Sequence, residues 1–286
     1  MMKLRKSSRR QARIKMALQG PAGSGKTYSS LLIAKGLVNE NFEKVAVIDS
    51  EKGSSDLYAD LGNYNVVALE NFSPETYIQA IELCEKEGME VIIIDSITHA
   101  WEFLLHYHGS LAGNSFTNWN KVTPRQRAFM DKILNSDAHI IATMRTKQDY
   151  VLNQKEGKYV PEKVGLKAVQ RDGVEYEFTL ILDLDIKHFA NSSKDRTGLF
   201  MDKPEFKITS GVGKQLYDWC NSGVNFSRMR EQIKSCNTHK QLNELYAKLS
   251  AYADDLNPDF VQQQNLIKNQ NFINLQNHSK NGTTSN

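Results

Sequence analysis

The sequence is short of cysteine and has no long hydrophobic run. Its 286 residues include three cysteines, which lie far apart at Cys84, Cys220 and Cys236. Neither a disulfide framework nor a zinc site is indicated, because the cysteines lack paired spacing. No apolar stretch approaches the roughly 20 residues that a membrane-spanning helix needs, and the N-terminus lacks the apolar core of a signal peptide. We therefore expect a cytoplasmic protein with no membrane partner.

Charge is nearly balanced overall but unevenly distributed. The formal net charge is +3, yet the N-terminal stretch contains no acid and is rich in cations, namely Lys3, Arg5, Lys6, Arg9, Arg10, Arg13 and Lys15. Such a basic arm suits a polyanion. The alternatives are a solvated, disordered terminus and an amphipathic transit peptide.

A complete phosphate-loop motif follows this arm. The pattern G-x-x-x-x-G-K-[ST] is satisfied by Gly20-Pro21-Ala22-Gly23-Ser24-Gly25-Lys26-Thr27. Apolar residues precede it at 16–18 and follow it at 31–34, so that a strand should turn into a helix here. The glycines let successive N–H groups converge on phosphate oxygens at the helix N-terminus. We assign residues 20–28, through Tyr28, to nucleotide binding; the alternative is a Gly-rich turn that binds nothing.

The motif also predicts a bound magnesium ion. Lys26 is expected between the β- and γ-phosphates of ATP, and the Thr27 hydroxyl is expected to ligate Mg²⁺. A predicted strand at 90–96 is a run of apolar residues followed by Asp95. A strand of this form delivers a carboxylate to the same ion. Thr27 and Asp95 are therefore the predicted metal ligands.

Two other predicted strands end in candidates for catalysis. The apolar strand 44–49 ends at Asp49-Ser50-Glu51, and the apolar strand 139–144 ends at Arg145-Thr146-Lys147. Sheets of α/β proteins bind ligands at the carboxyl ends of their strands. Glu51 is thus well placed for chemistry, and Arg145 for sensing the γ-phosphate.

The remaining predicted elements surround this framework. Strands are expected at 65–69 and 178–186, and helices at 26–38, from Pro74 with Ser73 as its cap, at 97–107 and from Thr123-Pro124. A polar loop is expected at 109–115. Residues 216–256 have helical spacing, and the Asn- and Gln-rich tail from 262 is expected to be disordered.

Two charged segments suggest contacts with other molecules. A predicted loop at 148–173 combines cations with tyrosines, namely Lys155, Lys158, Lys163, Lys167, Arg171, Tyr150 and Tyr159. Because base stacking together with backbone charge holds single strands without sequence preference, we expect this loop to contact DNA; the alternative is a solvated hairpin. Cations also occur in a predicted turn at Lys194-Asp195-Arg196-Thr197-Gly198. Paired cations on such a turn can reach the phosphate of a nucleotide bound to a neighbouring subunit; the alternative is an ordinary charged turn.

Together these motifs resemble the RecA core. Ile48-Asp49-Ser50-Glu51 is similar to its second strand, whose final acid activates the attacking water, and Ile93-Ile94-Asp95-Ser96 is similar to its Walker B strand. Arg145 stands at the phosphate-sensing strand tip, where RecA itself has glutamine. Lys194-Asp195-Arg196-Thr197-Gly198 resembles the Lys-x-Arg-x-Gly trans-acting motif of related proteins. Over residues 12–205 the chain most resembles compact RecA-like ATPases of bacteriophages, many described simply as AAA-family ATP-binding proteins.

The resemblance implies an activity and partners. It implies that Lys26 and the loop hold ATP, that Thr27 and Asp95 hold Mg²⁺, and that Glu51 activates water with Arg145 as sensor. Lys194 or Arg196 would reach an adjacent subunit's site, which implies a homo-oligomer. Some members of this group assist single-strand annealing and recombination beside a single-strand-binding protein, in the host cytoplasm. The loops at 109–119 and 148–173 correspond by position to the DNA-facing loops of RecA.

The predicted fold is α/β, a mostly parallel sheet with helices on both faces, plus a small C-terminal helical segment. We expect four regions: a basic arm at 1–12, a RecA-like ATPase core at 13–219, a helical segment at 220–260 and a disordered polar tail at 261–286. The alternative function is a nucleotide-switched scaffold or loader that binds a protein partner without touching DNA. A small-molecule kinase is disfavoured, because Glu51 lies beside the γ-phosphate and no Arg-rich lid is evident.

Overall fold

The computed structural model describes residues 12–155 and 158–281, and for residues 148–165 and 270–281 it describes the path of the backbone only. The chain divides into two compact units. One is Arg13–Cys220, and the other contains the helices that follow Asn221. Each unit has its own apolar core. The predicted basic arm lies outside the described residues, apart from its last residue, Ala12.

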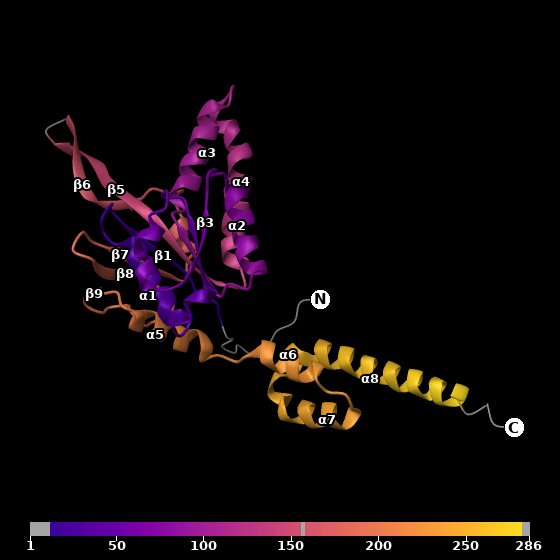
Figure 1. Cartoon of the computed structure of the whole chain (residues 1–286). Coiled ribbons are helices and arrows are strands. Elements are labelled where there is room, and N and C mark those ends of the chain that lie inside the picture. Colours follow the sequence, from indigo (N-terminus) through magenta and orange to yellow (C-terminus); the bar gives the residue numbers. More distant parts are fainter. Residues whose placement is uncertain (1–11, 156–157, 282–286) are drawn as a thin grey trace. The chain divides into compact units, whose positions relative to one another are not determined.

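The larger unit is built on one sheet (Figure 1). Among the described residues the strand order is β3-β2-β4-β5-β1-β7-β8-β9, with β6 paired to β5. Pairs from β3 through to β7 are parallel, whereas β7–β8, β8–β9 and β5–β6 are antiparallel. The strands are β1 (Lys15–Gly20), β2 (Val45–Asp49), β3 (Asn65–Ala68), β4 (Val91–Asp95), β5 (His139–Lys155), β6 (Lys158–Ala168), β7 (Leu180–Leu184), β8 (Phe189–Asp195) and β9 (Phe206–Lys207).

Helices cover both faces of this sheet (Figure 1). On one face lie α1 (Lys26–Leu37) and α5 (Ser210–Asn221); on the other lie α2 (Pro74–Lys86), α3 (Thr98–Ser110) and α4 (Ser115–Asn135). Short 3₁₀ turns are η1 (Phe42–Lys44), η2 (Ser55–Leu61) and η3 (Val174–Tyr176). The predicted mostly parallel α/β sheet is confirmed.

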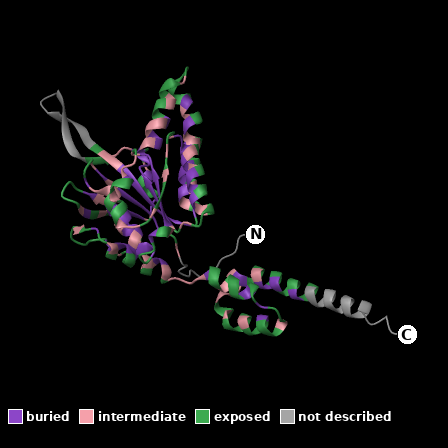
Figure 2. Cartoon of the chain, viewed as in Figure 1, coloured by how far each residue is buried: buried purple, intermediate pink, exposed green. Residues whose placement is uncertain are grey.

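The central strands are buried on both faces, as Figure 2 shows. In β4, Val91 and Ile93 belong to the core under α1, whereas Ile92 and Ile94 belong to the core under α2 and α4. Successive strand residues point to opposite faces, so a strand covered on both sides must be apolar throughout. This explains why the β-branched runs in the sequence located the strands correctly.

The two predicted loops have different outcomes. The polar loop expected at 109–115 is present at 111–114, between α3 and α4, but α4 begins at Ser115 rather than at Thr123, because the Asn114 side chain accepts a hydrogen bond from the Phe116 amide at 2.8 Å and caps the helix. Pro124 lies inside this helix rather than at its start. The fifth strand does not end at Arg145 but continues to Lys155 and pairs with β6. The predicted loop at 148–173 is therefore largely a β-hairpin.

The C-terminal unit consists of α6 (Phe226–Lys234), α7 (His239–Lys248), the 3₁₀ turn η4 (Ser250–Tyr252) and α8 (Ala253–Asn281). The tail expected to be disordered at 261–286 is instead part of α8 as far as Asn281, and its last five residues lie outside the described residues. Leu256, Phe260 and Ile267 recur at helical spacing and are at most 5% exposed, in a core shared with Phe226 and Ile233 of α6. This apolar stripe outweighs the Asn- and Gln-rich composition that predicted disorder.

Helices α1 and α5 approach each other closely because each presents a glycine. A Cβ added at Gly213 would lie 2.0 Å from the Ile33 carbonyl oxygen, and one added at Gly36 would lie 2.1 Å from the Ser210 carbonyl oxygen. Backbone atoms cannot move aside as a flexible side chain can. The two glycines therefore determine how tightly α5 packs on the helix that follows the phosphate loop.

Substituting Gly213→Ala is expected to lower the free energy of unfolding of the larger unit by about 3 kcal/mol or more, because the methyl group would overlap backbone atoms. Gly109→Ala in α3 is the matched control, since nothing lies within 4 Å of its added Cβ; it should be neutral or raise stability by about 0.5–1 kcal/mol. Urea unfolding followed by tryptophan fluorescence measures both, because Trp101, Trp119 and Trp219 all lie in this unit. Equal stability of the two variants would contradict the packing argument.

Candidate nucleotide-binding site

The phosphate loop joins β1 to α1 as the motif predicts. Gly23 and Gly25 have φ angles of 79° and 81°, in the left-handed region that favours glycine. A Cβ at Gly20 would lie 2.5 Å from the Leu184 carbonyl oxygen, so the end of β7 packs directly against the loop. The loop is thus shaped by glycines from within and supported by a neighbouring strand.

Lys26 begins α1 and turns back over the loop. Its Nζ donates hydrogen bonds to the carbonyl oxygens of Gly20 at 2.9 Å and Pro21 at 2.8 Å. Burial lowers the pKa of Lys26 from its usual value, while the carboxylates of Asp95 and Glu51 oppose that fall. The ammonium group is therefore held above the loop, close to acidic side chains, where a phosphate anion would be a better partner than two neutral carbonyls.

Asp95, at the end of β4, is buried between two threonines. Its Oδ2 accepts a hydrogen bond from Thr27 Oγ1 and its Oδ1 accepts one from Thr143 Oγ1, both at 2.5 Å. Burial raises the pKa of Asp95, and the two hydroxyl donors act against that rise. The predicted metal ligands Thr27 and Asp95 thus lie side by side, as two oxygen ligands of one Mg²⁺ would.

Thr143 belongs to the candidate site and was not predicted from the sequence. It lies in β5, directly beside Asp95 in the sheet, because Ile94 is paired with Ala142. A signal was present, since Thr143 interrupts the apolar run His139–Met144 at a position that is fully buried. Buried hydroxyl groups need hydrogen-bond partners, but the partner could be found only once β4 and β5 were known to be neighbours.

The turn after β2 is organised by Asp49, which is 2% exposed. Its carboxylate accepts hydrogen bonds from the Glu51 amide at 2.6 Å, the Ser55 amide at 3.1 Å and the Ser55 hydroxyl at 2.6 Å. Asp49 is therefore fully engaged in shaping the turn. Glu51, two residues on, remains available to point toward the phosphate loop.

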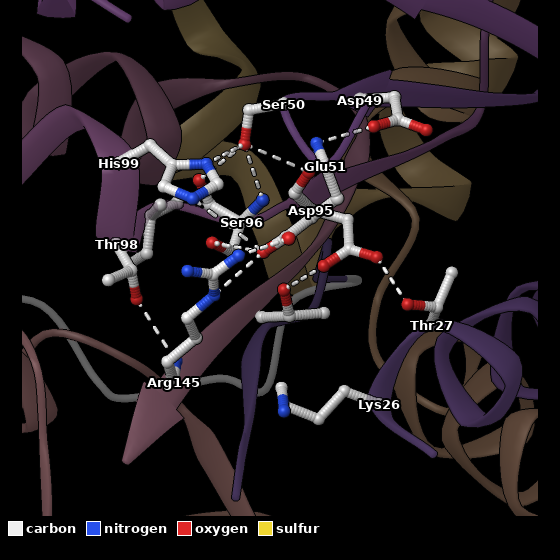
Figure 3. A network of polar contacts seen from close by, with 12 residues as sticks. Lys26, Thr27, Asp49, Ser50, Glu51, Asp95, Ser96, Thr98, His99 and Arg145 are labelled. Atoms are coloured by element: carbon white, nitrogen blue, oxygen red, sulfur yellow. Dashed lines mark hydrogen bonds and ion pairs between the residues drawn. The ribbon is translucent and has the colours of Figure 1, made fainter. Parts of the chain in front are cut away.

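Glu51 and Arg145 form an ion pair at the mouth of the site (Figure 3). Arg145 donates to Glu51 Oε1 from Nε at 3.0 Å and to Oε2 from Nη2, and the pairing raises the pKa of Arg145. The Arg145 amide in turn donates to Thr98 Oγ1 at 3.0 Å. The predicted water-activating acid and the predicted phosphate sensor are thus bound to each other.

A cavity of about 450 Å³ joins these groups. It is lined by Ala22, Gly23, Gly25, Lys26, Thr27, Glu51, Ser54, Tyr58, Asp95 and Arg145. Among the lining residues, Ser54 has a buried Oγ atom with no hydrogen-bond partner within the described parts of the chain, as expected of a group that binds a polar ligand. The Tyr58 ring lies 5.5 Å from that of Tyr28. These features fit ATP with Mg²⁺, and Tyr58 adds an aromatic surface that the prediction did not assign to nucleotide binding.

The two predicted trans-acting cations lie elsewhere. Lys194 Nζ donates to the carbonyl oxygens of Glu175 at 2.8 Å and Tyr176 at 2.6 Å, and Arg196 Nη2 donates to that of Tyr176 at 3.3 Å. Neither lines the nucleotide cavity of its own chain. Lys194 lies within β8 rather than in the predicted turn, because the strand pairs with β7 as far as Asp195.

Comparison with known proteins identifies the family. A family model described as an AAA domain matches residues 12–230, which include the phosphate loop, Glu51, Asp95 and Arg145. The chain belongs to the AAA-domain family of P-loop ATPases. No curated protein matches it. The match confirms the predicted class of nucleotide-binding protein. Among the described residues, the structure contains no helix with the length and apolar character of a membrane span.

Thr143→Val keeps the size of the side chain and removes the hydroxyl that holds Asp95. Hydrogen bonds to charged groups contribute about 1.5–3 kcal/mol, so affinity for ATP in the presence of Mg²⁺ should fall about 10-fold or more. Calorimetry with Mg²⁺ and with excess chelator measures the effect. Thr143→Ser, which keeps the hydroxyl, is the control. A loss of affinity that persists undiminished under chelator would show that Thr143 does not act through the metal ligand.

Proposed function

We propose that this AAA-domain protein is a RecA-like ATPase that hydrolyses ATP and acts on single-stranded DNA in phage-type recombination or replication. The proposal that the protein hydrolyses ATP rests on the position of Glu51, which lines the same cavity as the phosphate loop. A binding protein that only held nucleotide would not need an acid directed at the γ-phosphate position. The proposed setting is the cytoplasm, that of the bacterial host if the protein is encoded by a phage.

In the proposed mechanism, the loop amides and Lys26 bind the triphosphate, and Thr27 and Asp95 would hold Mg²⁺, which would neutralise charge on the phosphates. Glu51 orients a water molecule in line with the γ-phosphate and accepts its proton. The water oxygen bonds to the γ-phosphorus as the bond from that phosphorus to the β-γ bridging oxygen breaks, so that ADP and inorganic phosphate leave. Little covalent chemistry is required of the protein, because phosphoryl transfer is catalysed mainly by positioning and by electrostatics.

The ion pair of Glu51 with Arg145 gives this mechanism a control step. While the guanidinium group holds both carboxylate oxygens, Glu51 cannot accept a hydrogen bond from water along the same directions. A γ-phosphate carries more negative charge than a carboxylate and competes for Arg145. Binding of ATP would therefore release Glu51 and place Arg145 on the phosphate, so that the sensor and the base are set by one exchange of partners.

DNA contact is proposed for the β5–β6 hairpin and the segment that follows it. Most of the predicted cations and tyrosines belong to residues 148–165, whose side chains lie outside the described residues. Near the base of the hairpin, a second cavity of about 480 Å³ is lined by three cations, Lys167, Arg171 and Lys194, and by two acids, Asp172 and Glu175. Lys167 is paired with Asp172 at 2.7 Å, so the support for a phosphate backbone here is the excess of one cation. A single-strand-binding protein remains a proposed partner of the same complex.

The alternative, a nucleotide-switched scaffold or loader, has an observation of its own. In the C-terminal unit, Tyr246, Val261 and Leu266 are 44–48% exposed, and Tyr246 and Val261 border a small hollow between α7 and α8. Exposed apolar side chains that cluster in this way are typical of protein-binding surfaces.

The ATPase rate with and without single-stranded DNA, at two salt concentrations, decides between these functions. We expect stimulation that declines steeply as salt rises, because phosphate contacts release counterions. A Lys26→Ala variant controls for contaminating ATPases. A rate unaffected by DNA in protein that still binds ATP would contradict the DNA role and favour the scaffold.

Oligomer formation is proposed from Lys194 and Arg196, which do not reach the cavity of their own chain. If Arg196 completes a neighbour's site, the rate per subunit should rise with protein concentration, and Arg196→Ala should lower the plateau by about 10³-fold or more. Lys203→Ala, which removes another exposed cation nearby, should leave the rate unchanged. A rate per subunit that is independent of concentration, together with an unaffected Arg196→Ala variant, would refute the trans role.

A further inference from the structure

His99 lies behind Glu51, on the side away from the phosphate loop (Figure 3). It belongs to the first turn of α3, its side chain is 13% exposed, and its ring is stacked on that of Phe72 with centroids 5.0 Å apart. It does not line the nucleotide cavity. The imidazole is therefore held in a fixed orientation next to the site without being placed to touch the nucleotide.

The hydrogen bonds of Ser50 limit which ring nitrogen can carry a proton toward Glu51. Ser50 Oγ accepts from the Ser96 amide at 2.9 Å. Its one hydroxyl proton has three acceptors within reach, namely His99 Nδ1 at 2.8 Å and the carbonyl oxygens of Asp95 at 3.1 Å and Ser96 at 3.2 Å, and His99 Nδ1 is the nearest. If the hydroxyl donates to Nδ1, the neutral ring carries its proton on Nε2. If the ring is doubly protonated, Nε2 carries one as well. The remaining tautomer would aim a lone pair at a carboxylate and is disfavoured.

His99 Nε2 lies 3.9 Å from Glu51 Oε1. The same oxygen is already held by Arg145 Nε and, at 3.2 Å, by Ser96 Oγ. His99 is thus a nearby donor that the ion pair keeps at a distance. When Arg145 leaves, Glu51 loses both hydrogen bonds from the guanidinium group and keeps the one from Ser96 Oγ, which alone fixes its orientation only weakly.

We propose that His99 is the positioning residue of Glu51. When Arg145 moves to the γ-phosphate, the Nε2–H group of His99 donates a hydrogen bond to Glu51 Oε1 in place of Arg145. This inference rests on the proposed role of Glu51 in activating water. The carboxylate then remains anchored at one oxygen by His99 and Ser96, and its other oxygen is free to accept the proton of water. Ser50 and Phe72 keep the ring in place, so that the relay Ser50–His99–Glu51 orients the base.

Three substitutions separate positioning from simple support. His99→Phe keeps an aromatic ring against Phe72 and removes both ring nitrogens. His99→Gln can place an amide N–H near the position of Nε2. The shorter side chain of His99→Asn can reach Ser50 but not Glu51. Rates at saturating ATP and nucleotide affinities are measured for each, with Glu51→Gln and the double variant Glu51→Gln/His99→Phe alongside.

The expected result is a fall in kcat of up to about 100-fold in His99→Phe, with ATP affinity unchanged. His99→Gln should restore much of the rate and His99→Asn should not. Glu51→Gln should bind ATP and lose turnover. Adding His99→Phe to this variant should not lower kcat further, because the effects of substituting residues that act as a unit are not additive.

Other outcomes overturn the inference in different ways. Rescue by His99→Asn but not by His99→Gln would mean that the ring only supports Ser50. A normal rate in His99→Phe, with turnover lost in Glu51→Gln, would refute the positioning role and leave the proposed function standing. Full turnover in Glu51→Gln would refute the proposed role of Glu51 and the inference with it.

Discussion

The carboxylate of Asp95 is the point at which the segments of the site meet. Thr27 from the start of α1 and Thr143 from β5 donate to its two oxygens, and the Ser50 amide donates to its backbone carbonyl at 2.8 Å. A buried carboxylate is costly unless it is hydrogen-bonded, so these contacts also constrain the strands that provide them. The phosphate loop, the turn of Glu51 and the strand of Arg145 are thereby held in register around one charge.

The distribution of charge in the site explains its resting arrangement. The neighbouring strands β2 and β4 end at Asp49 and Asp95, and Glu51 lies two residues after β2. Two cations, Lys26 and Arg145, lie near Glu51 and Asp95. Asp49 is satisfied by its own turn and Asp95 by the threonines, which leaves Glu51 as the acid that needs a cation. Arg145 meets that need through the ion pair. In the proposed mechanism, the γ-phosphate competes with Glu51 for the same cation.

Local patterns predicted the parts of this site that depend on neighbours in sequence. The phosphate loop, the strand ending in Asp95 and the cap of α2 at Ser73, whose Oγ accepts from the Thr76 amide, all depend on a few consecutive residues. Thr143 and His99 could not be found in this way, because their roles depend on the order of strands in the sheet. The helical tail was missed for a related reason: composition suggested disorder, whereas Ile267 is 1% exposed in a core shared with α6.

The length of β5 has a consequence for how distant events could reach the site. Thr143 and Arg145 are two residues apart and so lie on the same side of the strand; one holds Asp95 and the other holds Glu51. The same strand continues into the hairpin with β6, where Thr146 is already paired with Ala168 and the register shifts between Asp149 and Tyr150. β1 and β4 pair with the part of β5 up to Arg145, and β6 pairs with the part beyond it. A displacement of the hairpin would thus act on the strand that contacts both Asp95 and Glu51.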